Sequence, residues 1–306
     1  MKTAEEIRIR DPFFLREGEG YYLFGTTSAD PWQNGMGFDC YYTRDLRNYE
    51  GPFPAFQPPE NFWADKNFWA PEVHRIAGSY YMFASFYREG THRGTQILRA
   101  DSPRGPYAPI SDGPYTPRDW DCLDGTFFEE NGKYYSVFAH EWLQVRDGTM
   151  ELVELNRELT AAVGEPVTLF RASDAAWTRP GDGSADGLVT DGPFLYRLSG
   201  GRLAMLWSSY GADGYALGAA YSKNGIHGPW VQEENPLYTK DGGHGMIFRD
   251  FDSRLRLAIH APNETLLERP VLLNLREENG KLVLDEAEMQ SDSCEADERI
   301  RALSPI

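Results

Sequence analysis

Three aspartates and one histidine stand immediately before runs of strand-forming apolar residues. They are Asp11 in "RDPFF", Asp124 in "LDGTFF", Asp191 in "TDGPFL" and His244 in "GHGMIF". A single aspartate before a strand usually caps a turn, but several carboxylates at one place repel unless a cation, a shared proton or a substrate compensates. Such a group could supply a general acid and a general base to a glycosidic bond. It could also hold Ca²⁺ through oxygens, although a histidine makes a wholly oxygen-ligated site less natural.

These residues recur because the chain repeats. Five stretches each contain a short apolar run, a polar turn and a second apolar run, and they follow one another at intervals of roughly 55–65 residues. Their first residues are Asp11, Ala70, Asp124, Asp191 and His244. Turns such as "REGEG" and "EENGK" carry the Gly or Asn that a hairpin needs. Further strand-like segments between the hairpins bring each unit to about four strands.

Repeated four-stranded units indicate radial repetition. We therefore expect an all-β fold, a five-bladed β-propeller with four-stranded antiparallel blades that forms a single catalytic domain over residues 1–306. Helical periodicity is scarce. Two stacked β-sandwiches are the alternative, which the lack of a linker or a shift in composition disfavours. Because the first strand of each propeller blade lines the axis, we expect the three aspartates and the histidine at equivalent positions around one channel.

The bulk composition bears on partners and location. A formal net charge of −17 repels phosphate backbones and anionic membranes, so neither nucleic acid nor a membrane is expected as a partner, whereas a neutral sugar is compatible. Cys40, Cys122 and Cys294 are far apart, odd in number and without metal-ligand spacing, which is typical of reduced thiols in the cytosol. The first residues show no apolar segment typical of a signal peptide, and we expect a cytoplasmic protein.

Aromatic residues near the repeat heads favour a sugar site. The segment "NFWADKNFWAPE" places Trp63 and Trp69 close to the head of the second repeat. Aromatic faces pack against the apolar C–H faces of sugar rings, although core packing would explain each tryptophan equally well. Glu72 and Phe127, close to the heads of the second and third repeats, are further candidates for substrate binding. No GxSxG, P-loop, HExxH or GxGxxG-before-helix motif competes with this interpretation.

Five motifs carry a resemblance to a known family. In chain order they are "RDPF", "WAPEV", "LDGTFF", "DGPFLYR" and "GHGMIF". Over roughly residues 8–285 the chain resembles glycoside hydrolase family 43, five-bladed propellers that hydrolyse arabinosides and xylosides with inversion. The resemblance implies that Asp11 is the general base and that Asp124 orients the acid and tunes its pKa. It also implies that His244 lies at the axis and helps to hold a hydrated Ca²⁺, and that Arg269 contacts the substrate.

The fourth motif departs from the family pattern. Asp191 stands where the family usually has a glutamate, its general acid, before "GP". The aspartate carboxyl reaches about 1.5 Å less far, and a misplacement of that order can cost about a hundredfold in rate. Asp191 could still be the acid in a slightly shifted site. Alternatively Glu72, Glu141 or Asp186 could supply the proton, or the protein could bind sugars without cleaving them.

The sequence therefore predicts an inverting exo-glycosidase that acts on a pentose-containing oligosaccharide of plant origin. A terminal α-L-arabinofuranoside is the expected substrate; a β-D-xylosidase of the same family and a catalytically weak carbohydrate-binding propeller are the alternatives. Asp11 would activate water, Asp191 would protonate the leaving oxygen, and Asp124 would keep that acid protonated. This chemistry requires no cofactor, and a structural Ca²⁺ at the axis is the one ion considered. The sequence carries no signal for an oligomeric state.

Overall fold

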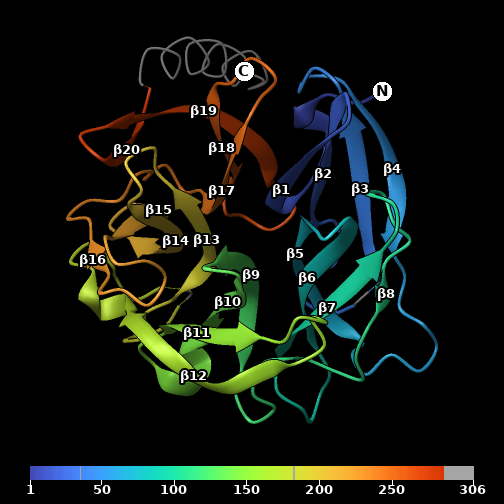
Figure 1. The fold of residues 1–306 in the computed structure, drawn as a ribbon, viewed down its shortest axis with the longest axis horizontal. Helices are drawn as coiled ribbons and strands as arrows, with labels where there is room; N and C mark the ends of the chain where they lie inside the picture. The colour runs from blue at the N-terminus through green and yellow to red at the C-terminus, as the bar shows by residue number, and fades with distance from the viewer. Residues whose placement is uncertain (35, 182, 286–306) are drawn as a thin grey trace, which may run out of the picture.

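Five sheets surround one axis. The computed structural model describes residues 1–306 except 35, 182 and 286–306. In the described residues each sheet has four strands in chain order, so every blade is one continuous piece of the chain (Figure 1). All the pairings are antiparallel; the inner pair of the first blade and that of the fourth illustrate this. The five-bladed β-propeller predicted from the repeats is confirmed.

The strand bounds follow the repeats. The first blade contains β1 (Arg10–Glu17), β2 (Gly20–Thr26), β3 (Phe38–Thr43) and β4 (Tyr49–Phe56). The second contains β5 (Lys66–Ile76), β6 (Ser79–Tyr87), β7 (Gly94–Ala100) and β8 (Ala108–Pro109). The third contains β9 (Cys122–Glu130), β10 (Lys133–His140), β11 (Thr149–Leu155) and β12 (Ala162–Arg171). The fourth contains β13 (Asp191–Arg197), β14 (Leu203–Gly211), β15 (Gly214–Ser222) and β16 (Val231–Gln232). The fifth contains β17 (Gly243–Arg249), β18 (Leu255–Ala261), β19 (Arg269–Glu278) and β20 (Lys281–Leu284).

Helical structure is limited to short turns. The described part of the chain has one α-helical turn, α1 (Trp142–Val145), and two 3₁₀ turns, η1 (Ala4–Glu6) and η2 (Ala172–Asp174). No described helix is long and apolar enough to cross a membrane. The hairpin between β9 and β10 shows why the strands form where they do. Its two turn residues, Asn131 and Gly132, both have positive φ (52° and 72°), as a tight two-residue hairpin requires.

Aromatic side chains fill the space between neighbouring blades. Phe56 and Phe68, from the first and second blades, pack with their ring centroids 6.1 Å apart, and Phe86 meets Phe68 at 4.8 Å. Trp207 of the fourth blade is fully buried against Trp177. Each such aromatic pair contributes about 0.5–1.5 kcal/mol beyond the area it buries. This packing fixes the blades relative to one another and therefore fixes the strand ends at the axis.

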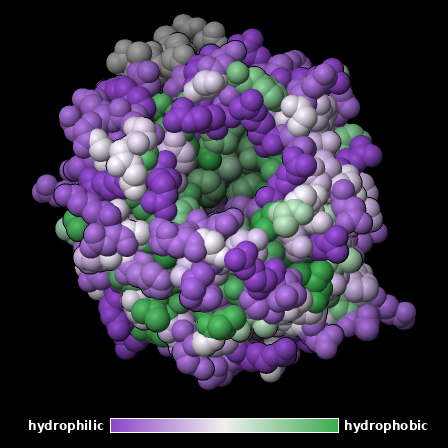
Figure 2. All heavy atoms as spheres, in the orientation of Figure 1, coloured by the Kyte–Doolittle hydropathy of each residue, from purple (hydrophilic) through white to green (hydrophobic). Residues whose placement is uncertain are grey.

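The ring closes by direct packing of the first blade on the fifth. β1 contacts β17 and β18. The rings of Phe14 and Phe248 stack at 5.1 Å, and the Ile9 amide donates a hydrogen bond to the Glu268 carbonyl oxygen at 3.3 Å. The central hollow of the propeller is visible in Figure 2, with hydrophilic residues around its rim and hydrophobic residues inside it. The axis is thus a place where residues far apart in the sequence meet.

Two of the three cysteines belong to the core. Cys40 and Cys122 are free and buried. Burial raises the pKa of the Cys40 thiol to about 12, so this side chain is an inert core residue. Cys294 lies outside the described residues.

Candidate active site

Each blade brings one residue with a left-handed backbone to the axis. The φ angles of these residues lie between 47° and 56°. From the first blade to the fifth they are Asp11, Ala70, Asp124, Gly192 and His244. In each innermost strand the pairing register also shifts at or beside this residue. Positive φ is uncommon for residues other than glycine, and its recurrence in all five blades defines what we call the axial position.

In the fourth blade, the alignment of the repeats made from the sequence is wrong by one residue. Gly192 occupies the axial position there, whereas Asp191 is the residue before it, which corresponds to Arg10 in the first blade and Trp69 in the second. A Cβ atom added at Gly192 would lie 2.7 Å from the ring of His244, so only glycine fits. The expectation that Asp191 is equivalent to Asp11 is therefore wrong, although both side chains reach the same cavity.

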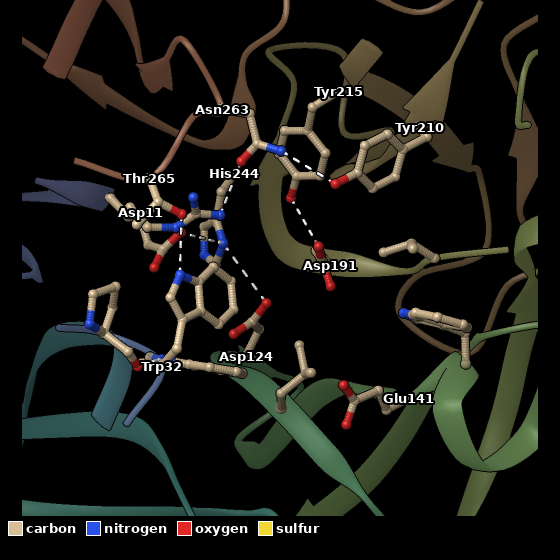
Figure 3. A pocket seen from close by; sticks show the side chains of 16 residues that line it. Asp11, Trp32, Asp124, Glu141, Asp191, Tyr210, Tyr215, His244, Asn263 and Thr265 are labelled. Atoms are coloured by element: carbon tan, nitrogen blue, oxygen red, sulfur yellow. Dashed lines mark hydrogen bonds and ion pairs between the residues drawn. The ribbon is translucent and has the colours of Figure 1, made fainter. Parts of the chain in front are cut away.

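A cavity of about 190 Å³ lies at the axis and gathers the acids. Four carboxylates line it, together with the imidazole of His244 (Figure 3). They belong to Asp11, Asp124, Glu141 and Asp191. The three aspartates named from the sequence thus share one small space, as the gathered-site prediction requires.

Asp11 is ionised. Its Oδ2 accepts a hydrogen bond from the hydroxyl of Thr26 at 2.6 Å, and its Oδ1 lies 3.1 Å from Nδ1 of His244. Burial alone would raise the pKa of this carboxyl, but the positive charges of His244 and Arg10 hold it well below its usual range. The carboxyl of Asp11 is therefore ionised at neutral pH and can accept a proton.

His244 bridges two of the acids. Its Nδ1 lies 3.1 Å from Asp11 and 3.6 Å from Oδ2 of Asp124. Burial would lower the pKa of the ring, but the two carboxylates outweigh burial and raise it to about 10. His244 is therefore an imidazolium at neutral pH, and its single positive charge interacts with both carboxylates.

Asp124 and Asp191 line the same cavity as Asp11. Oδ2 of Asp124 accepts the N–H of Gly192 at 3.0 Å, and the hydroxyl of Tyr215 donates to Oδ2 of Asp191 at 3.0 Å. Burial raises the pKa of both carboxyls, and the charge of Asp124 adds to this at Asp191, whose pKa rises to about 8. Asp191 therefore carries a proton at neutral pH. The cavity holds an ionised and a protonated carboxyl together, the combination that general base and general acid catalysis needs.

Aromatic side chains and one buried ion pair form the wall of the cavity. The guanidinium of Arg93 lies 4.3 Å from the ring centroid of Trp69 and forms an ion pair with Glu141. Trp32 meets Trp69 edge-on at 5.2 Å, and its indole N–H donates to Oγ1 of Thr265 at 3.0 Å. Arg93 thus fixes both a flat apolar platform and a carboxylate that faces the cavity, a pairing suited to the faces and hydroxyls of a sugar ring.

Sequence comparison supplies the family. The model of "Glycosyl hydrolases family 43" matches residues 6–292. The chain belongs to glycosyl hydrolase family 43. It is therefore an inverting glycoside hydrolase, and the resemblance found in the five motifs is confirmed.

Three proteins similar to this chain are named as an arabinase or an arabinofuranosidase. A crystal structure of an endo-arabinase from Bacteroides thetaiotaomicron VPI-5482 is 38% identical, with a TM-score of 0.84, over 91% of this chain and 98% of that one. The extracellular exo-alpha-(1->5)-L-arabinofuranosidase ArbA of Cellvibrio japonicus (strain Ueda107) is 24% identical over 94% of this chain and 89% of that protein. Alpha-L-arabinofuranosidase 43 of Humicola insolens is 24% identical over 76% of this chain, which spans 48% of that protein.

One of these relatives corrects the expected location. The Cellvibrio japonicus arabinofuranosidase is an extracellular enzyme, which favours secretion and contradicts the cytoplasmic location inferred from the sequence. That inference used the lack of an apolar segment among the first residues and the number and spacing of the cysteines. Where a given sequence begins says nothing about the location of the protein.

The family resemblance implies that His244 helps to hold a hydrated Ca²⁺ at the axis. Nδ1 of His244 faces two carboxylates, which leaves Nε2 as the ring atom that could bind a cation. The described residues contain no group of three or more His, Cys, Asp or Glu side chains arranged to hold a metal ion. Ca²⁺ at the axis stays an untested prediction, and no step below depends on it.

Four residues named from the sequence as substrate contacts lie outside the cavity, whereas Trp69 lines it. The indole N–H of Trp63 donates to Oε1 of Gln96 at 2.7 Å, in a separate groove at the edge of the second blade. The Arg269 guanidinium donates to the Glu5 carbonyl oxygen. Trp63 precedes β5 and Arg269 begins β19, the third strand of its blade, so neither belongs to the part of an innermost strand that reaches the axis.

Glu72 and Phe127 lie farther along innermost strands. Oε2 of Glu72 contacts Nε2 of His74 at 3.1 Å, and Phe127 packs against the same imidazole at 5.6 Å. Both residues follow the axial position of their blade, so the strand has already carried them away from the cavity. Of the alternative acids, Asp186 forms an ion pair with Arg146 outside the cavity. Glu141 alone among the three alternatives lines the cavity.

The sequence analysis missed much of the cavity wall. Trp32, Trp142, Tyr210, Tyr215 and Asn263 line it without having been named. A signal was available for several of them. In an antiparallel hairpin the second strand ends where the first begins, so residues that end or follow the second strand of a blade, such as Tyr210 and Asn263, return to the axial end.

Proposed function

We propose that this chain is an exo-acting α-L-arabinofuranosidase that releases terminal arabinose from arabinose-containing oligosaccharides with inversion. The observation that carries the proposal is the meeting of Asp11, Asp124 and Asp191 in one cavity, where burial and neighbouring charges drive the pKa values of Asp11 and Asp191 in opposite directions. The arabinan-acting relatives support the choice of glycone.

The reaction uses three carboxyl groups. Asp11 accepts a proton from a water molecule as its oxygen bonds to the anomeric carbon. Asp191 donates its proton to the glycosidic oxygen as the bond between this oxygen and the anomeric carbon breaks. The products are a free sugar with inverted configuration and a leaving alcohol, and the proton gained by Asp11 replaces through solvent the one lost by Asp191. Asp124 raises the pKa of Asp191, so the acid is loaded at the start of each cycle.

Glu141 is assigned a binding role. Its carboxylate is buried, lines the cavity and is paired with Arg93, an arrangement that lets it accept hydrogen bonds from sugar hydroxyls. Burial raises its pKa while the charge of Arg93 opposes the increase. At Asp191, burial and the charge of Asp124 raise the pKa more strongly than the charge of His244 lowers it, so Asp191 is the better proton donor of the two.

Endo-action on arabinan is the second candidate, favoured by the 38% identical endo-arabinase structure. One feature supports exo-action. The hydrogen bond between Trp32 and Thr265 joins the segment after β2 to the segment after β18, and so forms a wall on one side of the cavity. A wall limits the room for a chain that continues in both directions.

The test is hydrolysis of a panel of aryl pentosides and of linear arabino-oligosaccharides. We expect 4-nitrophenyl α-L-arabinofuranoside to be cleaved faster than the β-D-xyloside, and arabinose to be the first product from the oligosaccharides, with the inverted anomer seen by NMR. Early products of two or more residues would establish endo-action instead. A lack of turnover on all pentosides, with sugar binding retained, would identify a binding propeller and overturn the proposal.

A further inference from the structure

The backbone N–H of the axial residue follows one rule at four of the five junctions between blades. It is donated to a side chain on the second strand of the preceding blade. The acceptors are His260 for Asp11 (3.2 Å), Thr26 for Ala70 (2.9 Å), Ser85 for Asp124 (2.8 Å) and Ser208 for His244 (2.8 Å). Each acceptor stands directly across its own sheet from the residue that precedes the axial position.

The junction between the third and fourth blades breaks this rule. The equivalent position on β10 is Ala139, which pairs with Leu123 and has no polar side-chain atom. The N–H of Gly192 is donated instead to Oδ2 of Asp124, at 3.0 Å. The exception thus falls at the junction that lies between Asp124 and the strand carrying Asp191.

We propose that Ala139 is a positioning residue for catalysis: because it offers no acceptor, the amide of Gly192 is left to Asp124, which is thereby held beside Asp191. The proposal rests on the function proposed above, in which Asp191 is the general acid. Ala139 does not touch the reacting groups, since it is fully buried in the core between the third and fourth blades. It acts because its methyl side chain cannot accept a hydrogen bond.

An acceptor at position 139 would release Asp124. A serine hydroxyl there would lie where Ser85 and Ser208 lie in their blades, within reach of the next axial N–H. Asp124 would then lose a donor that favours its ionised form, and its carboxylate would no longer be held at the start of β13. The displacement moves the negative charge away from Asp191, so the pKa of Asp191 falls.

The experiment compares the pH dependence of kcat/KM for wild type and Ala139→Ser on arabino-oligosaccharides. We expect the apparent pKa of the alkaline limb of this pH profile to fall from about 8 to about 7. This shift corresponds to about a fivefold loss of kcat/KM at pH 8 and almost no loss at pH 5.5. Ala139→Cys is the matched control, because a thiol has a similar shape but is a weak acceptor. The cysteine variant should keep the wild-type limb.

A double-mutant cycle shows whether Ala139 acts through Asp124. In an Asp124→Asn background, Ala139→Ser should cause no further shift of the alkaline limb. Any of three results would overturn the proposal. The alkaline limb of Ala139→Ser could be the same as that of wild type, or the limb of Ala139→Cys could shift as far as that of Ala139→Ser. Thirdly, Ala139→Ser could cause its full shift in the Asp124→Asn background. If the serine variant does not fold, Ala139→Thr replaces it, because a threonine, Thr26, supplies the acceptor at another junction. Failure of both variants to fold would also overturn the proposal, because the other four junctions accommodate an acceptor.

The same measurements separate this proposal from the proposed function. A wild-type protein that hydrolyses no pentoside counts against the function. An active wild type whose alkaline limb is unchanged by Ala139→Ser counts against the role of Ala139 alone.

Discussion

Asp124→Asn tests whether the charge of this residue keeps the general acid protonated. The substitution removes a negative charge beside Asp191 but keeps an oxygen that can accept the Gly192 N–H. A like charge next to a buried carboxyl raises its pKa by about 1–3 units, so its removal should lower the pKa of Asp191 from about 8 to about 6. The protonated fraction of Asp191 at pH 7 then falls from about 0.9 to about 0.1.

The expected signature is a pH-dependent defect. With arabino-oligosaccharides, kcat/KM of Asp124→Asn should be about tenfold below wild type at pH 7 and within about twofold of it at pH 5, where Asp191 is protonated in both proteins. Asp11 stays ionised at both pH values because the charge of His244 holds its pKa low. A loss of equal size at every pH would refute this reasoning, since it would show that Asp124 acts by orientation or binding and not through its charge.

Four further predictions concern the same cavity. Asp11→Asn should lower kcat/KM by about 10²–10⁴ on every substrate, because the attacking water loses its base; near-normal hydrolysis would assign the base elsewhere. Asp191→Asn should cause a loss of that size on oligosaccharides and a much smaller one on aryl glycosides with good leaving groups, whereas equal losses on both would exclude Asp191 as the acid. Gly192→Ala places a Cβ atom 2.7 Å from the ring of His244 at a φ of 51° and should lower the free energy of unfolding by about 1–3 kcal/mol, measured in urea; unchanged stability would show that the axis can yield. Prolonged dialysis against a chelator should leave activity unchanged because His244 is protonated, and loss of activity restored by Ca²⁺ would show that a metal replaces that proton.

The repeats predicted the fold because each blade uses the same local signals. Turns such as Asn131–Gly132 and the alternation of apolar runs repeat in sequence as they do in space. Asp11, Asp124 and His244 could be found in the same way, since each is the axial residue of its blade. The fourth blade could not be aligned by residue type, because the steric limit that demands glycine at position 192 comes from His244, a residue of another blade.

The residues of the cavity wall were harder to predict because they lie at strand ends and in the connections between strands. The direction of these segments depends on the fold. Tyr215 and Thr265 reach the site from the strand and the segment that follow the second strands of their blades. Their role becomes visible only when the blades are placed around the axis. Trp63 shows the opposite error: its sequence neighbourhood resembles that of Trp69, but its indole lies in a groove at the blade edge.

The proton on Asp191 follows from burial and from the charges along one chain of contacts. Asp11 contacts His244, His244 contacts Asp124, and Asp124 accepts the N–H of the residue that follows Asp191. His244 faces both Asp11 and Asp124, whereas at Asp191 burial and the charge of Asp124 raise the pKa more than the charge of His244 lowers it. The third acid therefore keeps its proton.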